Sequence, residues 1–190
     1  YYIKRNIQDI DKTNELLECL PPFCEDYFLG IEQRTSCQTR LKYAYDLRIF
    51  FDFLCKRKYR KKDVLDLTLE DLEGVTNNDI EFFLSYLSHY RFNEKSLSCD
   101  ERAKARKLSA VRAMFKYFFN KGLIEVDNSS KVQTPKLHEK EIIRLEAEEV
   151  SKLIDIAESG SGLSRHASGY HDKTKIRDIA IITLFLGTGI

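Results

Sequence analysis

The sequence predicts an all-α fold over its first 130 residues, because two kinds of signal recur there. Apolar residues repeat at spacings of three and four, the period of a helix with one buried face, whereas alternation with a period of two is nearly absent. Residues that cap or stop helices stand at the ends of these periodic stretches. Only three prolines occur and 43% of the residues are hydrophobic, so a packed core is expected rather than disorder.

Two helices are expected in the first sixty residues. A short one follows the Pro-Pro pair at 21–22 and ends near Gly30. Thr35 or Ser36 then caps a longer helix that is apolar on two faces, which suits a helix packed between neighbours. The basic run 56–62 ends this helix. Cations there favour the negative end of the helix dipole, and contact with phosphate explains them equally well.

Two further helices and a short helical piece are predicted before residue 122. The short piece covers 65–72, and Thr76 caps a helix that ends within 89–91. The last helix begins within 98–100 and stops before Gly122, because glycine readily adopts the left-handed conformation that ends helices.

The helix predicted to end before residue 122 carries a basic stripe opposite its apolar face. The stripe holds Arg102, Arg106, Ser109, Ala113 and Lys116, spaced four, three, four and three residues apart. Small residues stand between cations, so a polyanion can approach the helix closely. A solvated helix face is the competing interpretation, and the stripe by itself favours it.

The net charge of +1 conceals an uneven distribution. Residues 31–135 hold 20 basic and 15 acidic side chains, whereas residues 1–30 hold 3 and 6, and residues 136–190 hold 8 and 9. A basic middle between mildly acidic ends indicates a polyanion-binding segment, because surface charge bears on partners rather than on fold.

Helical periodicity stops at 128–141 around Pro135, which predicts a linker between domains. A new helix is expected to open at 145–149 with acidic residues in its first turn. A Ser/Gly-rich loop at 160–169 and an apolar helix at 176–186 follow. The last helix is apolar all round and needs burial by further structure, so the C-terminal part is expected to be an incomplete domain.

Three stretches carry a family resemblance through their joint order and spacing. The run 39–50, TRLKYAYDLRIF, resembles the Thr-x-x-x-Tyr-x-x-Asp-Leu-x-x-Phe signature of tyrosine site-specific recombinases. The run 106–117, RKLSAVRAMFKY, resembles that family's Arg-x-Leu-Ser-Ala-Leu-Arg-x-Phe-x-x-Tyr block. The third stretch resembles the family's linker and its approach to the catalytic domain, in Thr134 to Lys136, Leu145 to Glu149, Arg177-Asp178 and Leu184 to Ile190.

The resemblance, to Xer-like and mobile-element integrases, implies a fold and a division of the chain. The expected fold is a SAM-like helical bundle of four to five helices, followed by the first helices of an incomplete α/β catalytic domain. The expected segments are an N-terminal extension, 1–24; a core-binding domain, 25–130; a linker, 131–144; and the truncated start of the catalytic domain, 145–190.

The family resemblance also implies function. Such enzymes bind duplex DNA sequence-specifically, assemble as tetramers on it, and cut and rejoin it through a 3′-phosphotyrosine intermediate. Their first catalytic arginine directly follows a turn like 187–189, so it is expected directly after Ile190 and no catalytic residue is expected within the chain. No cofactor, metal or small-molecule substrate is expected. A non-catalytic helical DNA-binding or adaptor protein that shares the bundle is the alternative.

The resemblance places DNA contacts on the second and fourth helices. By motif position they are Thr39, Arg40 and Tyr43 on the second, and Arg102, Lys104, Arg106, Lys107, Ser109 and Lys116 on the fourth. Tyr43 also lies beside the core stripe and has packing as a competing role. Arg112 is placed nearer the core, where its stem would pack and its head would pair with an acid.

The remaining polar signals predict no further site. The five cysteines are odd in number and scattered, which is typical of reduced side chains. His166 and His171 stand near Asp172, but a second pair of ligands at zinc spacing is missing. No apolar run approaches the roughly 18 residues of a membrane span, so a soluble, non-exported protein is expected. The resemblance to the recombinases implies a bacterial cytoplasmic location.

Overall fold

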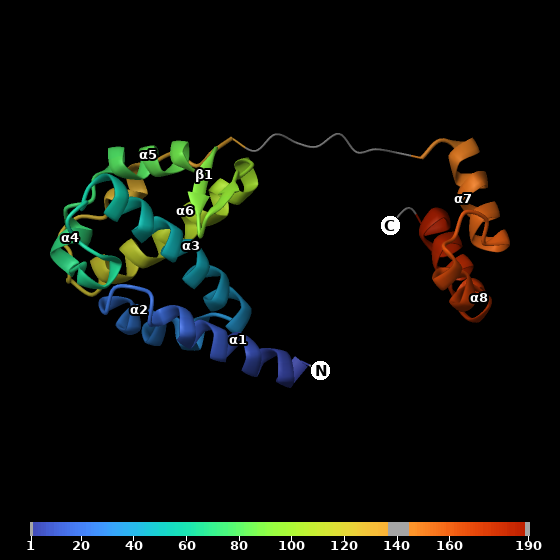
Figure 1. Ribbon diagram of the computed structural model, residues 1–190, viewed down its shortest axis with the longest axis horizontal. Helices are drawn as coiled ribbons and strands as arrows, with labels where there is room; N and C mark the ends of the chain where they lie inside the picture. Colours follow the sequence, from blue (N-terminus) through green and yellow to red (C-terminus); the bar gives the residue numbers. More distant parts are fainter. Residues whose placement is uncertain (1, 137–144, 189–190) are drawn as a thin grey trace. The chain divides into compact units, whose positions relative to one another are not determined.

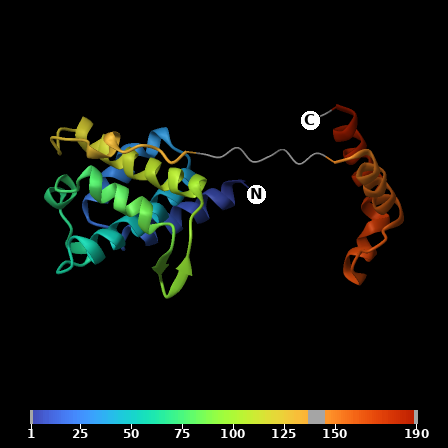
Figure 2. The ribbon, with the colours of Figure 1, turned by 90° about the horizontal axis from the view of Figure 1, so that it is seen from above.

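The computed structural model describes residues 2–136 and 145–188, which belong to two compact units, Tyr1–His138 and Glu139–Ile190. The first unit is a helical bundle with one small hairpin (Figures 1 and 2), which confirms the predicted all-α class. Its elements, in order, are α1 (Tyr2–Leu17), α2 (Phe23–Ile31), η1 (Glu32–Arg34), α3 (Cys37–Arg57), η2 (Val64–Asp66), α4 (Leu69–Glu73), α5 (Asn77–Tyr86), β1 (Tyr90–Phe92), β2 (Lys95–Leu97), α6 (Glu101–Asn120) and η3 (Asn128–Lys131).

Helix α3 lies between α1 and α6, as its two apolar faces predict. Its residues Leu47, Phe50, Phe51 and Leu54 are buried in a core that is rich in aromatic rings. Burying such side chains contributes roughly 1.5–3 kcal/mol each, so this core is the main source of stability. On α6, Leu108, Val111, Phe115 and Phe118 are buried, whereas Phe119 is 45% exposed because it lies one position beyond the inward face.

Side-chain caps set the starts of α3, α5 and α6. The Ser36 hydroxyl accepts from the Thr39 N–H at 3.2 Å, and the Thr76 hydroxyl accepts from the Asp79 N–H at 3.2 Å. The Asp100 carboxylate accepts from the Ala103 N–H at 2.8 Å. Each bond satisfies an N–H that has no partner inside the helix, which is why these polar residues begin the helices.

The first two dozen residues, expected as an extension ahead of the bundle, pack as part of it. Helix α1 runs against α3, and its Leu16 is buried together with Leu20 in the turn that follows. The compact unit therefore includes α1.

A β-hairpin replaces the predicted end of the helix that Thr76 caps. Helix α5 ends at Tyr86, and β1 pairs antiparallel with β2. The two turn residues, Asn93 and Glu94, have φ angles of 48° and 63°. Glutamate is uncommon in this left-handed region. Because Glu94 stands where the common Asn-Gly turn has glycine, the sequence carried no clear signal for a hairpin here.

The second unit consists, within its described residues, of α7 (Ala147–Ser159) and α8 (Arg165–Thr188). The predicted loop 160–169 was wrong in its second half, because α8 begins at residue 165. The Ser164 hydroxyl accepts from the Ala167 N–H at 3.3 Å and favours an early helix start. His171, considered as a metal ligand, instead contacts the Ala157 carbonyl oxygen through Nε2 at 2.9 Å and joins the two helices.

Several apolar side chains of α8 are exposed, among them Ile176 at 80% and Leu184 at 62%. Two helices leave these faces without cover, in agreement with the expected start of a larger domain. Across the described ranges, no helix combines the length and the hydrophobicity that crossing a bilayer requires.

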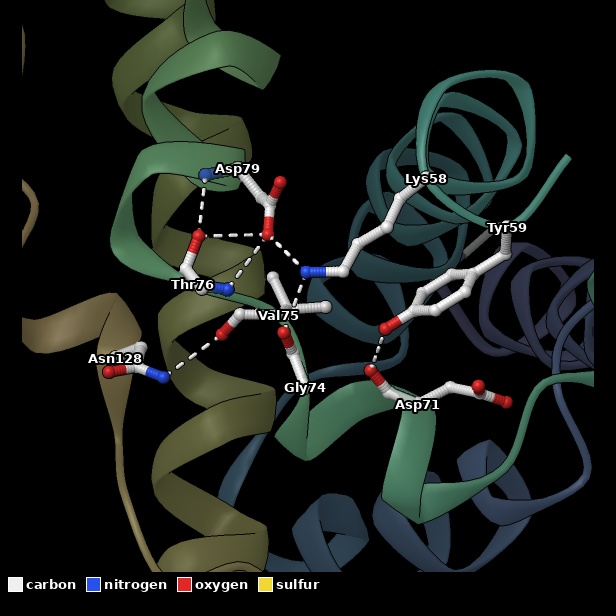
Figure 3. A network of polar contacts seen from close by, with 8 residues as sticks. All are labelled: Lys58, Tyr59, Asp71, Gly74, Val75, Thr76, Asp79 and Asn128. Atoms are coloured by element: carbon white, nitrogen blue, oxygen red, sulfur yellow. Dashed lines mark hydrogen bonds and ion pairs between the residues drawn. The ribbon is translucent and has the colours of Figure 1, made fainter.

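A polar network joins the end of α3 to the α4–α5 turn (Figure 3). The Lys58 ammonium donates to the Gly74 carbonyl oxygen at 2.7 Å and to the Asp79 carboxylate at 2.6 Å. The Tyr59 hydroxyl donates to the Asp71 carbonyl oxygen at 2.6 Å, and burial raises the pKa of Tyr59 to about 12, so this donor keeps its proton. The Asn128 amide donates to the Val75 carbonyl oxygen at 3.0 Å and thereby connects the segment after α6 to the α4–α5 turn.

Most cations of the basic run 56–62 form contacts with other residues of the same unit. Besides Lys58, Lys56 and Lys62 form ion pairs of 2.7 Å with Asp52 and Asp71. The Arg57 guanidinium lies 3.7 Å from the centre of the Phe82 ring. Four of the six cations in this run thus have intramolecular partners, which favours the structural interpretation of the run over phosphate contact.

We predict that the Asp79 contacts make the bundle sensitive to acid. Burial by itself would raise the pKa of Asp79, but the bonds from Lys58 and Thr76 outweigh it and hold this pKa below the usual value of 3.8. A carboxyl group with a lowered folded pKa stabilises the fold above its unfolded pKa and loses that contribution as the pH falls through the folded pKa. Asp79→Asn should therefore lower the unfolding free energy near neutral pH and flatten its decline below about pH 4.

Urea denaturation at a series of pH values measures this effect. Glu81→Gln removes a carboxylate from an exposed position of the same helix and serves as the matched control. An equal flattening in both variants would refute the role assigned to Asp79.

Candidate nucleic-acid interface

Helices α3 and α6 cross in the middle of the bundle (Figure 1) and are joined there by a buried carboxylate, Asp46. The Lys107 ammonium lies 2.6 Å from Asp46 Oδ1, and the two side chains are only 5% and 1% exposed. The Arg106 guanidinium approaches the same oxygen at 3.2 Å but stays 49% exposed. Two adjacent cations of α6 therefore share one acid of α3, one from inside and one from the surface.

This three-residue cluster lies where two of the family-like stretches meet. Asp46 belongs to the run 39–50, and the two cations open the run 106–117. The second carboxylate oxygen, Oδ2, is buried and has no hydrogen-bond partner among the described residues. Lys107 neutralises Asp46 at the shorter distance, so the cluster keeps a net positive charge that Arg106 presents outward. Sequence analysis did not single out Asp46; an acid within the apolar pattern of α3 was the available signal.

Two predicted contact residues are directed into the protein. Lys107 is buried with its ammonium on Asp46, because position 107 falls beside the core residue Leu108 rather than on the stripe. Arg40 donates to the carbonyl oxygens of Glu32, at 3.0 Å, and Thr35, at 2.7 Å, and its side chain is 11% exposed. Arg40 thus closes the turn ahead of α3.

Four predicted residues share the exposed face of α6: Arg102, Arg106, Ser109 and Lys116, which we call the α6 stripe. The Ser109 hydroxyl donates to the Ala105 carbonyl oxygen at 2.9 Å and retains its acceptor capacity. Lys104 is half-buried on the opposite side of α6 and donates to the Ser88 hydroxyl at 2.7 Å.

The predicted residues of α3 contribute less surface. Thr39 is half-buried, and its hydroxyl lies 2.9 Å from that of the capping Ser36. Tyr43 is half-buried and packs against the core, in line with the competing role considered for it. Both residues share a helix face with Asp46. They therefore lie on the side of α3 where Asp46 pairs with Arg106 of the α6 stripe.

Arg112 has a different partner from the predicted acid. Its guanidinium donates to the carbonyl oxygens of Ser129 and Val132 and, at 2.8 Å, to the Thr134 hydroxyl. The first part of the predicted linker is thereby held against α6. Within residues 2–136 and 145–188, no group of three or more side chains is arranged to hold a metal ion.

Comparison with known proteins finds that the chain is similar to tyrosine recombinases. The chain is 31% identical over 182 residues to tyrosine recombinase XerC of Caldanaerobacter subterraneus subsp. tengcongensis, covering 90% of the chain and 46% of the relative. It is 30% identical over 210 residues to tyrosine recombinase XerS of Lactococcus lactis subsp. cremoris, covering 97% of the chain and 57% of the relative. For tyrosine recombinase XerS of Streptococcus agalactiae the identity is 26% over 209 residues, with 95% and 57% covered.

The chain thus spans about half the length of the curated relatives it matches. No protein-family model and no solved structure matches it.

We predict that Lys107→Met destabilises the bundle by about 3–5 kcal/mol, because it leaves the Asp46 carboxylate buried with one surface cation in place of two partners. Adding Asp46→Leu should restore most of the loss, since an apolar pair removes the unpaired charge. Urea denaturation of the two single variants and the double variant gives the coupling energy. If the double variant is no more stable than Lys107→Met, the buried pair does not join the two helices in the way described.

Proposed function

Since this chain belongs to the tyrosine recombinase family, we propose that its first unit binds duplex DNA sequence-specifically through the α6 stripe. The observation that carries the proposal is the state of Arg106. Its guanidinium is oriented by Asp46, yet half of the side chain is exposed, and Lys107 already neutralises that carboxylate. A guanidinium has five donors in a planar fork, so most of them remain available to phosphate oxygens or base edges.

The dimensions of α6 support this use of the stripe. Arg102 and Lys116 are fourteen residues apart, about 21 Å along a helix, whereas the DNA major groove is about 12 Å wide. Cations at the two ends reach the phosphate rows on either side of the groove. Ser109 and the small Ala113 lie between them, so the middle of the helix can come close to the bases.

On this proposal the parent enzyme cuts and rejoins DNA through a 3′-phosphotyrosine intermediate, and it assembles as a tetramer on its site in the bacterial cytoplasm. The residues of this chain bind DNA without cleaving it. The first unit up to residue 130, with α1 included, corresponds to the core-binding domain, 131–144 to the linker, and α7 and α8 to the first helices of the catalytic domain.

We predict that Arg106→Gln weakens binding to a fluorescently labelled duplex of mixed sequence, because it removes a preoriented cation from the centre of the stripe. The expected cost is about 1–3 kcal/mol. Lys116→Gln should lower the magnitude of the slope of log K against log salt by about 0.9, the value for one neutralised phosphate. Fluorescence anisotropy over a series of salt concentrations measures both effects.

Lys61→Gln removes the same charge from an exposed position in the basic run and serves as the control. Thermal unfolding of each variant separates loss of binding from loss of fold. A chain that binds no duplex even at low salt would fit the adaptor alternative and end the DNA-binding proposal.

A further inference from the structure

A groove between the end of α2 and the last turns of α6 lies beside the α6 stripe. Its volume is about 430 Å³, and its lining combines three apolar side chains with three cations. These six residues are Ile31, Ala113 and Tyr117, and Arg34, Lys116 and Lys121; we call the cavity the α2–α6 groove.

The wall of the groove is fixed by a close approach of the two helices. A Cβ atom on Gly30 would lie 2.3 Å from Cε2 of Tyr117, so only glycine lets the ring pass at this distance. The Tyr117 hydroxyl donates to the Asp26 carbonyl oxygen at 2.9 Å, and its ring packs edge-on against Tyr27, 5.5 Å away. The groove therefore exists before any ligand binds.

The charged residues that line the groove are all basic. Arg34, Lys116 and Lys121 are exposed, and no carboxylate is among the lining residues. Within the described ranges, none of these cations takes part in an ion pair of 4.0 Å or less. The Asn120 amide adds a neutral donor at the same rim. Three exposed cations over an apolar floor suit an anionic group carried on an apolar body.

We propose that the α2–α6 groove holds a phosphodiester of the DNA backbone, with the deoxyribose against the apolar floor and the phosphate among the three cations. This inference rests on the proposed function. The groove continues the α6 stripe, because Lys116 belongs to both. Arg106 and Lys116 are ten residues apart, about 15 Å along the helix, so the groove contacts a different phosphate from the one that Arg106 reaches.

Arg34→Gln, Lys121→Gln and the double variant test the groove against the labelled duplex of mixed sequence. The double change should lower the magnitude of the salt slope by up to about 0.9, the value for one neutralised phosphate, and each single change by less, because the three cations share one phosphate. The loss should be the same on duplexes of different sequence, since a backbone contact does not distinguish bases. Both positions are exposed, so thermal unfolding should be unchanged.

Lys61→Gln again controls for net charge. If it reduces the slope as much as Arg34→Gln does, the effect is general electrostatics and the groove assignment is wrong. If Arg106→Gln weakens binding while the double groove variant keeps the full slope, the groove fails and the proposed function stands. If neither changes binding, both proposals fail.

Discussion

The buried carboxylate of Asp46 is the constraint on which the rest of the first unit depends. An ionised group out of water costs several kcal/mol unless it is paired, and here both cations come from the neighbouring helix. The crossing of α3 and α6 is therefore fixed by charge as well as by the aromatic core. Because one of the two cations is half exposed, the same pairing that holds the crossing also orients a surface arginine.

Basic residues of this protein divide by helical phase into internal and external groups. Lys107, one position beyond Arg106, faces inward and is buried, while Arg112 holds the chain that leaves the bundle. A count of cations along α6 cannot separate these groups. The directions of the side chains in the structure do separate them. The exposed cationic face is narrower than the sequence indicated, and the packing of α2 against α6 extends it towards Arg34 and Lys121.

The helices were predictable because their signals are local. Caps at Ser36, Thr76 and Asp100 and a repeat of three to four residues fix where each helix begins and which face it buries. The hairpin was missed because its strands are three residues long and Glu94 is atypical in such a turn.

The inward positions of Lys107 and Arg40 were missed for another reason. Lysine and arginine are rarely buried without a partner, and their partners, Asp46 and the carbonyl oxygens before α3, become neighbours only through tertiary structure. The α2–α6 groove likewise joins residues some eighty positions apart. Most cations of the α6 stripe and the α2–α6 groove contribute charge without supporting the core. Substituting them should therefore lower DNA affinity and leave the free energy of unfolding unchanged. Arg106 alone among them couples the two, because its loss leaves Lys107 as the one remaining cation on Asp46.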